Sequence, residues 1–132
     1  MARSAPLPVV YIVDADESVR QSLLRLMGSA DLLARTCDTL GAFARETVGA
    51  NVACALVDVS GLFNCEPGLW LQLQARAAVV PIIALSAHDD AATRRIARAL
   101  GAQAFFRKPV DAAALLDSIE WVTRAEGPRA ST

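Results

Sequence analysis

Two carboxylates and one ammonium group stand where successive apolar runs of this chain end. Asp14 follows the run VVYIV, Asp58 follows CALV, and Lys108 follows AFFR. If these runs are strands of one parallel sheet, their ends meet at a single edge, which is where open α/β sheets hold their ligands. Two carboxylates and an ammonium group at that edge predict a site for a divalent metal ion and a phosphoryl group.

Each of these groups has a chemical role at such a site and also a plain structural interpretation. Asp58 is the candidate nucleophile, because a strand-end carboxylate can attack a phosphoryl group and form an acyl phosphate; alternatively it merely begins a loop. Asp14 is a candidate ligand of Mg²⁺ or an N-cap of the following helix. Lys108, the only lysine in the chain, can pair with Asp58 and with phosphoryl oxygens, or is a solvated surface residue.

A fourth apolar run ends in two small residues that suit the same site. Ser86 offers a hydroxyl group that can donate a hydrogen bond to a phosphoryl oxygen, and Ala87 leaves space for that oxygen. The alternative is an ordinary serine at the end of a strand.

These residues need a scaffold in which short strands alternate with helices. The strand candidates are Val9–Val13, Leu32–Cys37, Cys54–Asp58, Val80–Leu85 and Ala104–Phe106. Helices are predicted from Asp16 to Gly28, Thr39 to Glu46, Gly68 to Arg76, Asp90 to Leu100 and Asp111 to about Arg124, with Gly28 and Gly101 as C-terminal breakers. This order predicts one doubly wound α/β domain over residues 1–124, with a parallel sheet, helices on both faces and a disordered tail at 125–132.

Composition restricts the class of protein. With 132 residues, 54% of them hydrophobic, the chain suits one well-buried domain. A formal net charge of −1 argues against direct nucleic-acid binding. The longest apolar stretch, 77–85, contains a proline and is too short to span a membrane, and the segment MARSAPLP lacks the apolar core of a secretory signal. Three cysteines without metal-ligand spacing suit reduced thiols, so we expect a cytoplasmic protein.

Four segments together resemble the receiver domains of bacterial two-component response regulators. They are VYIVDADESVR, CALVDVS, PIIALSAHDD and GAQAFFRKPV, which occur in this order over nearly the whole chain. Within that family, the segments most resemble the receivers of nitrogen-fixation-type transcriptional regulators. The resemblance implies a flavodoxin-like fold with the strand order 2-1-3-4-5. It also implies a phosphorelay function, in which Asp58 accepts a phosphoryl group, with Mg²⁺, from a sensor histidine kinase or a histidine phosphotransfer protein; beyond its own phosphotransfer and autodephosphorylation, the domain would not be an enzyme.

The resemblance also assigns roles to individual residues. It implies that Asp14, Asp58 and the backbone carbonyl of Ser60 hold the metal ion, with Asp16 as a further candidate. It places the phosphoryl-binding and switch roles on Ser86, Ala87, Lys108 and Phe105, and it implies a cis peptide bond between Lys108 and Pro109. By the same resemblance, Ser60 and His88 flank the path of attacking water and tune the lifetime of the phosphorylated state.

The chain departs from the family pattern beside both catalytic carboxylates. Family members commonly carry two adjacent acidic residues after the first strand, whereas Asp14 is followed by Ala15. We therefore expect Mg²⁺ to be held weakly. The loop VSGLFNCEPG after Asp58 lacks the usual Met-Pro pair and could cover the site or present Leu62 and Phe63 to a partner.

The predicted output surface lies on the fourth helix, the fifth strand and the fifth helix. Arg94, Arg95 and Arg98 lie away from the apolar stripe of the fourth helix, and Trp121 lies on the flank of the fifth. An outward tryptophan favours contact with a downstream protein or a second copy of the chain.

Two other function classes fit parts of the sequence. One is a pseudo-receiver, an interaction module whose Mg²⁺ binding and phosphorylation are impaired by Ala15. The other is a phosphatase resembling the haloacid dehalogenases, with Asp14 as nucleophile, Asp16 as general acid, Ser86 binding phosphate and Lys108 as the cation. The chain is short for a phosphatase of that type, and that interpretation leaves Asp58 without a role.

Overall fold

The computed structural model describes residues 8–49 and 51–130, with side chains up to Arg124. The strands are β1 (Val9–Val13), β2 (Leu33–Cys37), β3 (Val52–Asp58), β4 (Ile82–Ser86) and β5 (Ala104–Arg107). The helices are α1 (Glu17–Ser29), α2 (Leu40–Arg45), α3 (Pro67–Ala77), α4 (Ala91–Leu100) and α5 (Ala112–Ala130), with a 3₁₀ helix η1 (Ser60–Asn64) after β3. The predicted alternation of strands and helices is therefore confirmed.

The five strands form one parallel sheet in the order β2-β1-β3-β4-β5, as predicted. The bounds of four strands differ from the prediction by one or two residues. β2 begins at Leu33 rather than Leu32, and β5 ends at Arg107 rather than Phe106. β3 begins at Val52 rather than Cys54, and β4 begins at Ile82 rather than Val80. The amide of Val80 still donates to the Arg76 carbonyl at 2.9 Å, so Val80 belongs to the turn that ends α3.

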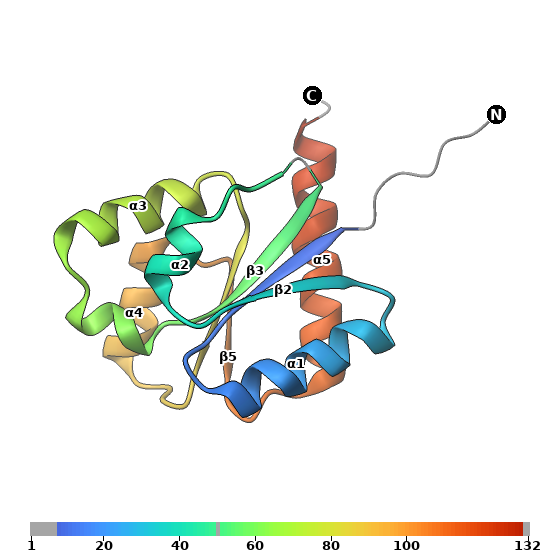
Figure 1. Cartoon of the computed structure of the whole chain (residues 1–132), viewed down its shortest axis with the longest axis horizontal. Coiled ribbons are helices and arrows are strands. Elements are labelled where there is room, and N and C mark those ends of the chain that lie inside the picture. The colour runs from blue at the N-terminus through green and yellow to red at the C-terminus, as the bar shows by residue number, and fades with distance from the viewer. Residues whose placement is uncertain (1–7, 50, 131–132) are drawn as a thin grey trace.

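Helices cover both faces of the sheet, and each face has its own core. Figure 1 shows α1 and α5 on one side and α2, α3 and α4 on the other. Alternate residues of the central strands point to opposite faces. On β1, Tyr11 belongs to the cluster beneath α2 and α3, whereas Ile12 belongs to the cluster beneath α1 and α5. Burial on both faces explains why the central strands read as continuous apolar runs.

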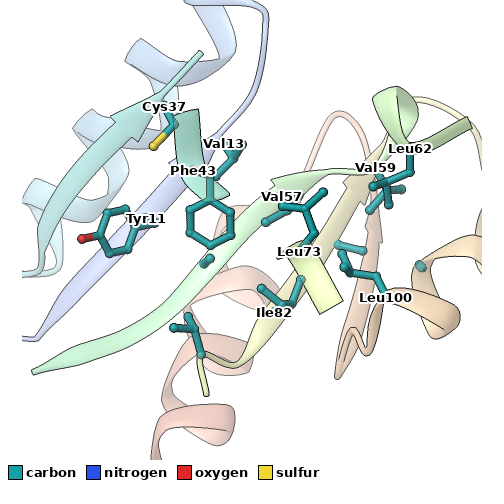
Figure 2. Packing of buried hydrophobic residues seen from close by; sticks show 14 residues of the cluster. Tyr11, Val13, Cys37, Phe43, Val57, Val59, Leu62, Leu73, Ile82 and Leu100 are labelled. Carbon is teal, nitrogen blue, oxygen red and sulfur yellow. The ribbon is translucent and has the colours of Figure 1, made fainter. Parts of the chain in front are cut away.

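The first of these clusters is built around aromatic packing. The rings of Tyr11 and Phe43 lie with their centroids 5.7 Å apart in a tilted arrangement, and Figure 2 shows them beside Val57 and Leu73. The guanidinium of Arg76 lies 5.6 Å from the centroid of the Phe43 ring. It also donates hydrogen bonds to the Ala44 and Glu46 carbonyls. Arg76 thereby fixes the end of the short α2 against α3.

Side-chain caps begin the helices where the sequence pattern placed them. The carboxylates of Asp16, Asp90 and Asp111 accept hydrogen bonds from amides of the first turns of α1, α4 and α5. At the other end of α4, Gly101 adopts the left-handed conformation with φ of 105°, as expected for a C-terminal breaker.

The predicted role of Gly28 is wrong. α1 continues to Ser29, and the left-handed residue in the following turn is Asp31, with φ of 60°. Its amide donates to the Gly28 carbonyl at 3.2 Å. Aspartate tolerates this conformation better than most residues, so the glycine is not needed for the turn.

The loop after Asp58 divides its two large apolar residues between core and surface. Leu62 is 4% exposed and lies with Val59 and Leu100 in the cluster of Figure 2. Phe63 is 51% exposed. Of the two alternatives that the sequence left open for this loop, presentation to a partner is therefore excluded for Leu62, because η1 turns that side chain inward.

The last helix is longer than predicted. α5 ends at Ala130 rather than near Arg124, so its backbone includes most of the segment predicted as a disordered tail. Residues 131 and 132 lie outside the described residues. Within the described parts of the chain, every helix is too short or too polar to traverse a bilayer.

Candidate functional site

The carboxyl ends of β1, β3 and β5 bring Asp14, Asp58 and Lys108 together. The Lys108 ammonium donates to Asp14 Oδ2 at 2.6 Å and also to Asp58 Oδ2. These three residues come from segments 44 to 94 residues apart only because β3 lies between β1 and β4, with β5 next to β4. The predicted convergence of the strand ends is therefore present, and Lys108 is not a solvated surface residue, since only 17% of its side chain is exposed.

Asp14 is buried and held on several sides. Its Oδ1 accepts a hydrogen bond from the Asp16 amide at 2.9 Å, its carbonyl accepts one from Arg20 Nη1 at 2.8 Å, and its own amide donates to the Cys37 carbonyl at 3.1 Å. The residue is 4% exposed. Asp14 is therefore not the N-cap of α1, and its carboxylate is oriented for the site.

The N-cap of α1 is Asp16, which the sequence left open as a metal ligand. Asp16 Oδ1 accepts from the amides of Ser18 and Val19 and from the Ser18 hydroxyl. The side-chain bond from Ser18 is the main reason that the pKa of Asp16 lies below its usual value. This carboxylate serves the helix terminus rather than the site.

Opposing effects act on the ionisation of Asp58. Burial is the largest single influence and would raise its pKa, but hydrogen bonds from Lys108 and Ser60 together outweigh it, so the pKa lies below its ordinary value. One of these bonds joins the Ser60 amide to Asp58 Oδ1 at 2.8 Å. For Lys108, burial is again the largest influence and opposes ionisation, but bonds to Asp14 and Asp58 raise the pKa overall. Asp58 and Lys108 are therefore both held in their charged forms.

Ser86 lies at the adjacent strand end. The residue is 1% exposed, and its Oγ accepts a hydrogen bond from the His88 amide at 3.0 Å. The Ser86 carbonyl accepts a hydrogen bond from the Lys108 amide at 2.8 Å, which connects the end of β4 to the segment that follows β5. Because the hydroxyl group accepts this bond, its proton remains available for an external oxygen. Ala87 and His88 are exposed at the edge of the site.

The segment around Lys108 has the form that the resemblance implies. The Lys108–Pro109 peptide bond is cis. Phe105, three residues earlier in β5, is half-buried. The guanidinium carbon of Arg94 lies 4.8 Å from the centroid of its ring.

The donor groups of the site fit a hydrated Mg²⁺ ion. A cavity of about 260 Å³ lies beside the acidic pair, lined among others by Asp14, Asp38, Asp58 and Ser60. Among the described residues, no group of three or more His, Cys, Asp or Glu side chains could hold a metal ion. Mg²⁺ usually keeps several waters and uses only one or two protein carboxylates, so Asp14 and Asp58 suffice as charged ligands.

Asp38 is a lining residue that sequence reasoning missed. It comes directly after β2 and shares the cavity with Asp14 and Asp58. The rule that singled out those two residues, a carboxylate after an apolar strand, also covers Asp38. It was not recognised because β2 is an edge strand whose sequence, LARTC, is only partly apolar.

The predicted output surface is partly occupied by internal contacts. Arg95 and Arg98 are exposed on α4, and Trp121 is 59% exposed on α5. Arg94 is instead paired with Asp89, through bonds from its Nε and Nη2 to both carboxylate oxygens. Arg94 is exposed as predicted, but its guanidinium also contacts Asp89 and Phe105, and its role at a partner surface stays a prediction.

Comparison with known families points to one family. The family model described as the response regulator receiver domain matches residues 10–120. The chain is 32% identical over 112 residues to the transcriptional regulatory protein FixJ of Azorhizobium caulinodans, covering 83% of this chain and 52% of that protein. It is 36% identical to the transcriptional regulatory protein TdiR of Thauera aromatica, covering 83% and 48%. The chain thus spans about half the length of these curated relatives.

Solved structures show the same architecture. The response regulator StyR superposes with a TM-score of 0.76 at 31% identity, covering 96% of this chain and 64% of that one. A response regulator receiver protein from Burkholderia phymatum superposes with a TM-score of 0.70 at 31% identity, covering 88% and 94%. The chemotaxis protein CheY4 of Vibrio cholerae, at 19% identity and a TM-score of 0.71, shares the fold.

Proposed function

Because the chain belongs to the family of response regulator receiver domains, we propose that it accepts a phosphoryl group on Asp58 and signals through its α4, β5 and α5 surface. The observation that carries the proposal is the contact of Lys108 with both Asp14 and Asp58 at the carboxyl edge of the sheet. The phosphoryl donor is a phosphohistidine on a sensor histidine kinase or a histidine phosphotransfer protein.

The transfer follows from the position of the Asp58 carboxylate. An Asp58 oxygen attacks phosphorus, an O–P bond forms, the N–P bond of the donor breaks, and the imidazole leaves and takes up a proton. Asp58 is suited to the attack because its lowered pKa keeps it ionised. In the later hydrolysis, water attacks phosphorus and the Asp58 O–P bond breaks, which releases inorganic phosphate and restores the carboxylate.

The neighbours of Asp58 stabilise the charge that collects on the transferred oxygens. Lys108 already contacts Asp58 and can move its ammonium group to a phosphoryl oxygen as that charge develops. Ser86 has a hydroxyl proton available for a second oxygen, and Ala87 leaves room beside it. The phosphoryl group carries about two negative charges, where the Asp58 carboxylate carried one, so Lys108 and Ser86 are drawn toward it in the product.

Asp14, Asp58 and the Ser60 carbonyl are the groups that would hold Mg²⁺ beside this reaction. When bound, the ion neutralises charge on the phosphoryl oxygens. Ala15 supplies no ligand, so fewer charges hold the ion here than in a receiver with two adjacent acidic residues. This is why weak Mg²⁺ binding belongs to the proposal.

The test is labelling with acetyl phosphate, followed by intact-mass measurement with and without Mg²⁺. We expect one added phosphoryl group in the presence of Mg²⁺ and none in Asp58→Asn. Asp38→Asn is the matched control, because it removes a carboxylate from the same cavity without removing the nucleophile. Persistent labelling of Asp58→Asn would contradict the proposal, and labelling at Asp14 would favour a phosphatase-like reaction. An unlabelled wild-type protein at high Mg²⁺ would support the pseudo-receiver.

A further inference from the structure

Arg94 contacts two separate parts of the chain through its guanidinium group. On one side, its Nε and Nη2 donate to both oxygens of Asp89, in the loop between β4 and α4. On the other side, its guanidinium carbon lies 4.8 Å from the centroid of the Phe105 ring in β5. A planar guanidinium group is suited to both contacts at once, because its edge matches a carboxylate and its face stacks on an aromatic ring.

The Asp89 side of this connection leads directly to the phosphorylation site. Asp89 follows His88, whose amide donates to Ser86 Oγ at 3.0 Å. If Ser86 moves toward a phosphoryl group on Asp58, His88 and Asp89 must follow or that hydrogen bond must break. The first event moves the carboxylate that Arg94 holds, and the second removes a hydrogen bond that fixes the loop carrying this carboxylate.

The Phe105 side leads to the output surface. Arg94, Arg98, Gln103 and Phe105 line a groove of about 280 Å³ between α4 and β5. The Arg94 guanidinium lies over the Phe105 ring, and both residues line this groove. Release of Arg94 from Asp89 would free the ring to change its position.

The pairing of Arg94 with Asp89 is bidentate. The bond from Arg94 is the main reason that the pKa of Asp89 lies below its ordinary value. The same bond is the main reason that the pKa of Arg94 lies above the ordinary value for arginine. Bidentate geometry and simultaneous cation–π contact hold one conformation of the side chain better than an isolated surface ion pair does.

We propose that Arg94 is a positioning residue that latches Phe105 to the loop between β4 and α4 and thereby stabilises the unphosphorylated conformation of the domain. This inference rests on the proposed receiver function. Loss of the latch lowers the cost of reaching the phosphorylated conformation. From the ordinary strengths of an exposed ion pair and a cation–π contact, the equilibrium shifts by roughly 3- to 10-fold.

Two measurements on the full chain test the latch. The first is fluorine NMR of unphosphorylated protein that carries 4-fluorophenylalanine at position 105. We expect Arg94→Gln to move this signal toward its position in the acetyl-phosphate-treated wild type. The second is the rate of labelling by acetyl phosphate with Mg²⁺, which should rise roughly 3- to 10-fold in Arg94→Gln and in Asp89→Asn. The double variant should add little to either single change, since both remove the same contact.

Arg98→Gln is the matched comparison, because it removes the same charge from the same helix and groove without touching Asp89. If Arg98→Gln shifts the fluorine signal of Phe105 as much as Arg94→Gln does, the proposal is wrong. The effect would then come from the loss of a positive charge in the groove. An unchanged Phe105 signal in Arg94→Gln would overturn the proposal as well. If no variant is labelled, wild type included, the receiver function fails. In that case a Phe105 signal in Arg94→Gln that differs from the signals of the untreated wild type and of Arg98→Gln still shows that Arg94 holds Phe105.

Discussion

Replacing Lys108 by methionine should destabilise the fold and reverse how its stability depends on pH. The substitution keeps most of the side-chain volume but removes the cation that contacts both Asp14 and Asp58. Only 3% of the Asp14 side chain and 18% of the Asp58 side chain are exposed, so water cannot fully replace the ammonium group. Two like charges would then share a poorly solvated site.

The magnitude follows from this burial. Removing one partner of a fully buried ion pair costs about 3–5 kcal/mol. Because Asp58 and Lys108 keep some contact with solvent, we expect a somewhat smaller loss, about 2–4 kcal/mol in the free energy of unfolding at pH 7. Asp58→Asn in the Lys108→Met background should recover most of the loss, since it removes the repulsion.

The sign of the pH dependence differs between the two proteins. In the wild type the pKa of Asp58 is lowered, so its stabilising contribution is present above the unfolded pKa and is lost as pH falls through the folded pKa. In Lys108→Met, burial and the neighbouring carboxylate should raise the pKa of one carboxyl group above its unfolded value. That protein should therefore gain stability between pH 7 and about pH 5, where the wild type gains none from this site.

The assay is urea denaturation followed by circular dichroism in metal-free buffer at pH 7 and pH 5. A free energy of unfolding for Lys108→Met within 0.5 kcal/mol of the wild type, on the scale of ordinary surface substitutions, would refute the reasoning. A further fall in its stability at pH 5 would refute it equally.

Three further predictions concern the metal, the lifetime and the core. Ala15→Asp should tighten Mg²⁺ binding in a calorimetric titration, because it adds a carboxylate beside Asp14; unchanged affinity would show that the ion does not use this position. Ser60→Ala and His88→Ala should alter the rate at which labelled protein loses its phosphoryl group, measured by mass over time, while leaving the thermal midpoint unchanged; identical decay in both variants and the wild type would contradict their proposed role. Leu62→Ala should lower the free energy of unfolding by about 2–5 kcal/mol and Phe63→Ala by much less, because only Leu62 is buried; equal losses in urea denaturation would show that η1 does not pack as described.

Local sequence patterns were sufficient to predict the strands, the helices and the ends where the reactive residues lie. Asp14 and Asp58 follow apolar runs, and such runs are strand-like because both faces of a central strand are buried. Asp90 and Gly101 mark the two ends of α4 through backbone requirements that involve only neighbouring residues. These features depend on interactions within a few residues, so the sequence alone determines them.

Features that depend on distant residues were decided by the tertiary structure. Leu62 and Phe63 are adjacent and equally apolar, yet only the packing of η1 in the cluster with Leu100 determines which one is buried. The contacts of Arg94 with Phe105 depend on the neighbouring positions of α4 and β5, which the helical pattern of α4 cannot show. The contact of Lys108 with both carboxylates likewise requires the order of the strands. A charged side chain pairs with whichever groups the fold brings within a few ångströms, and that proximity is a property of the assembled sheet.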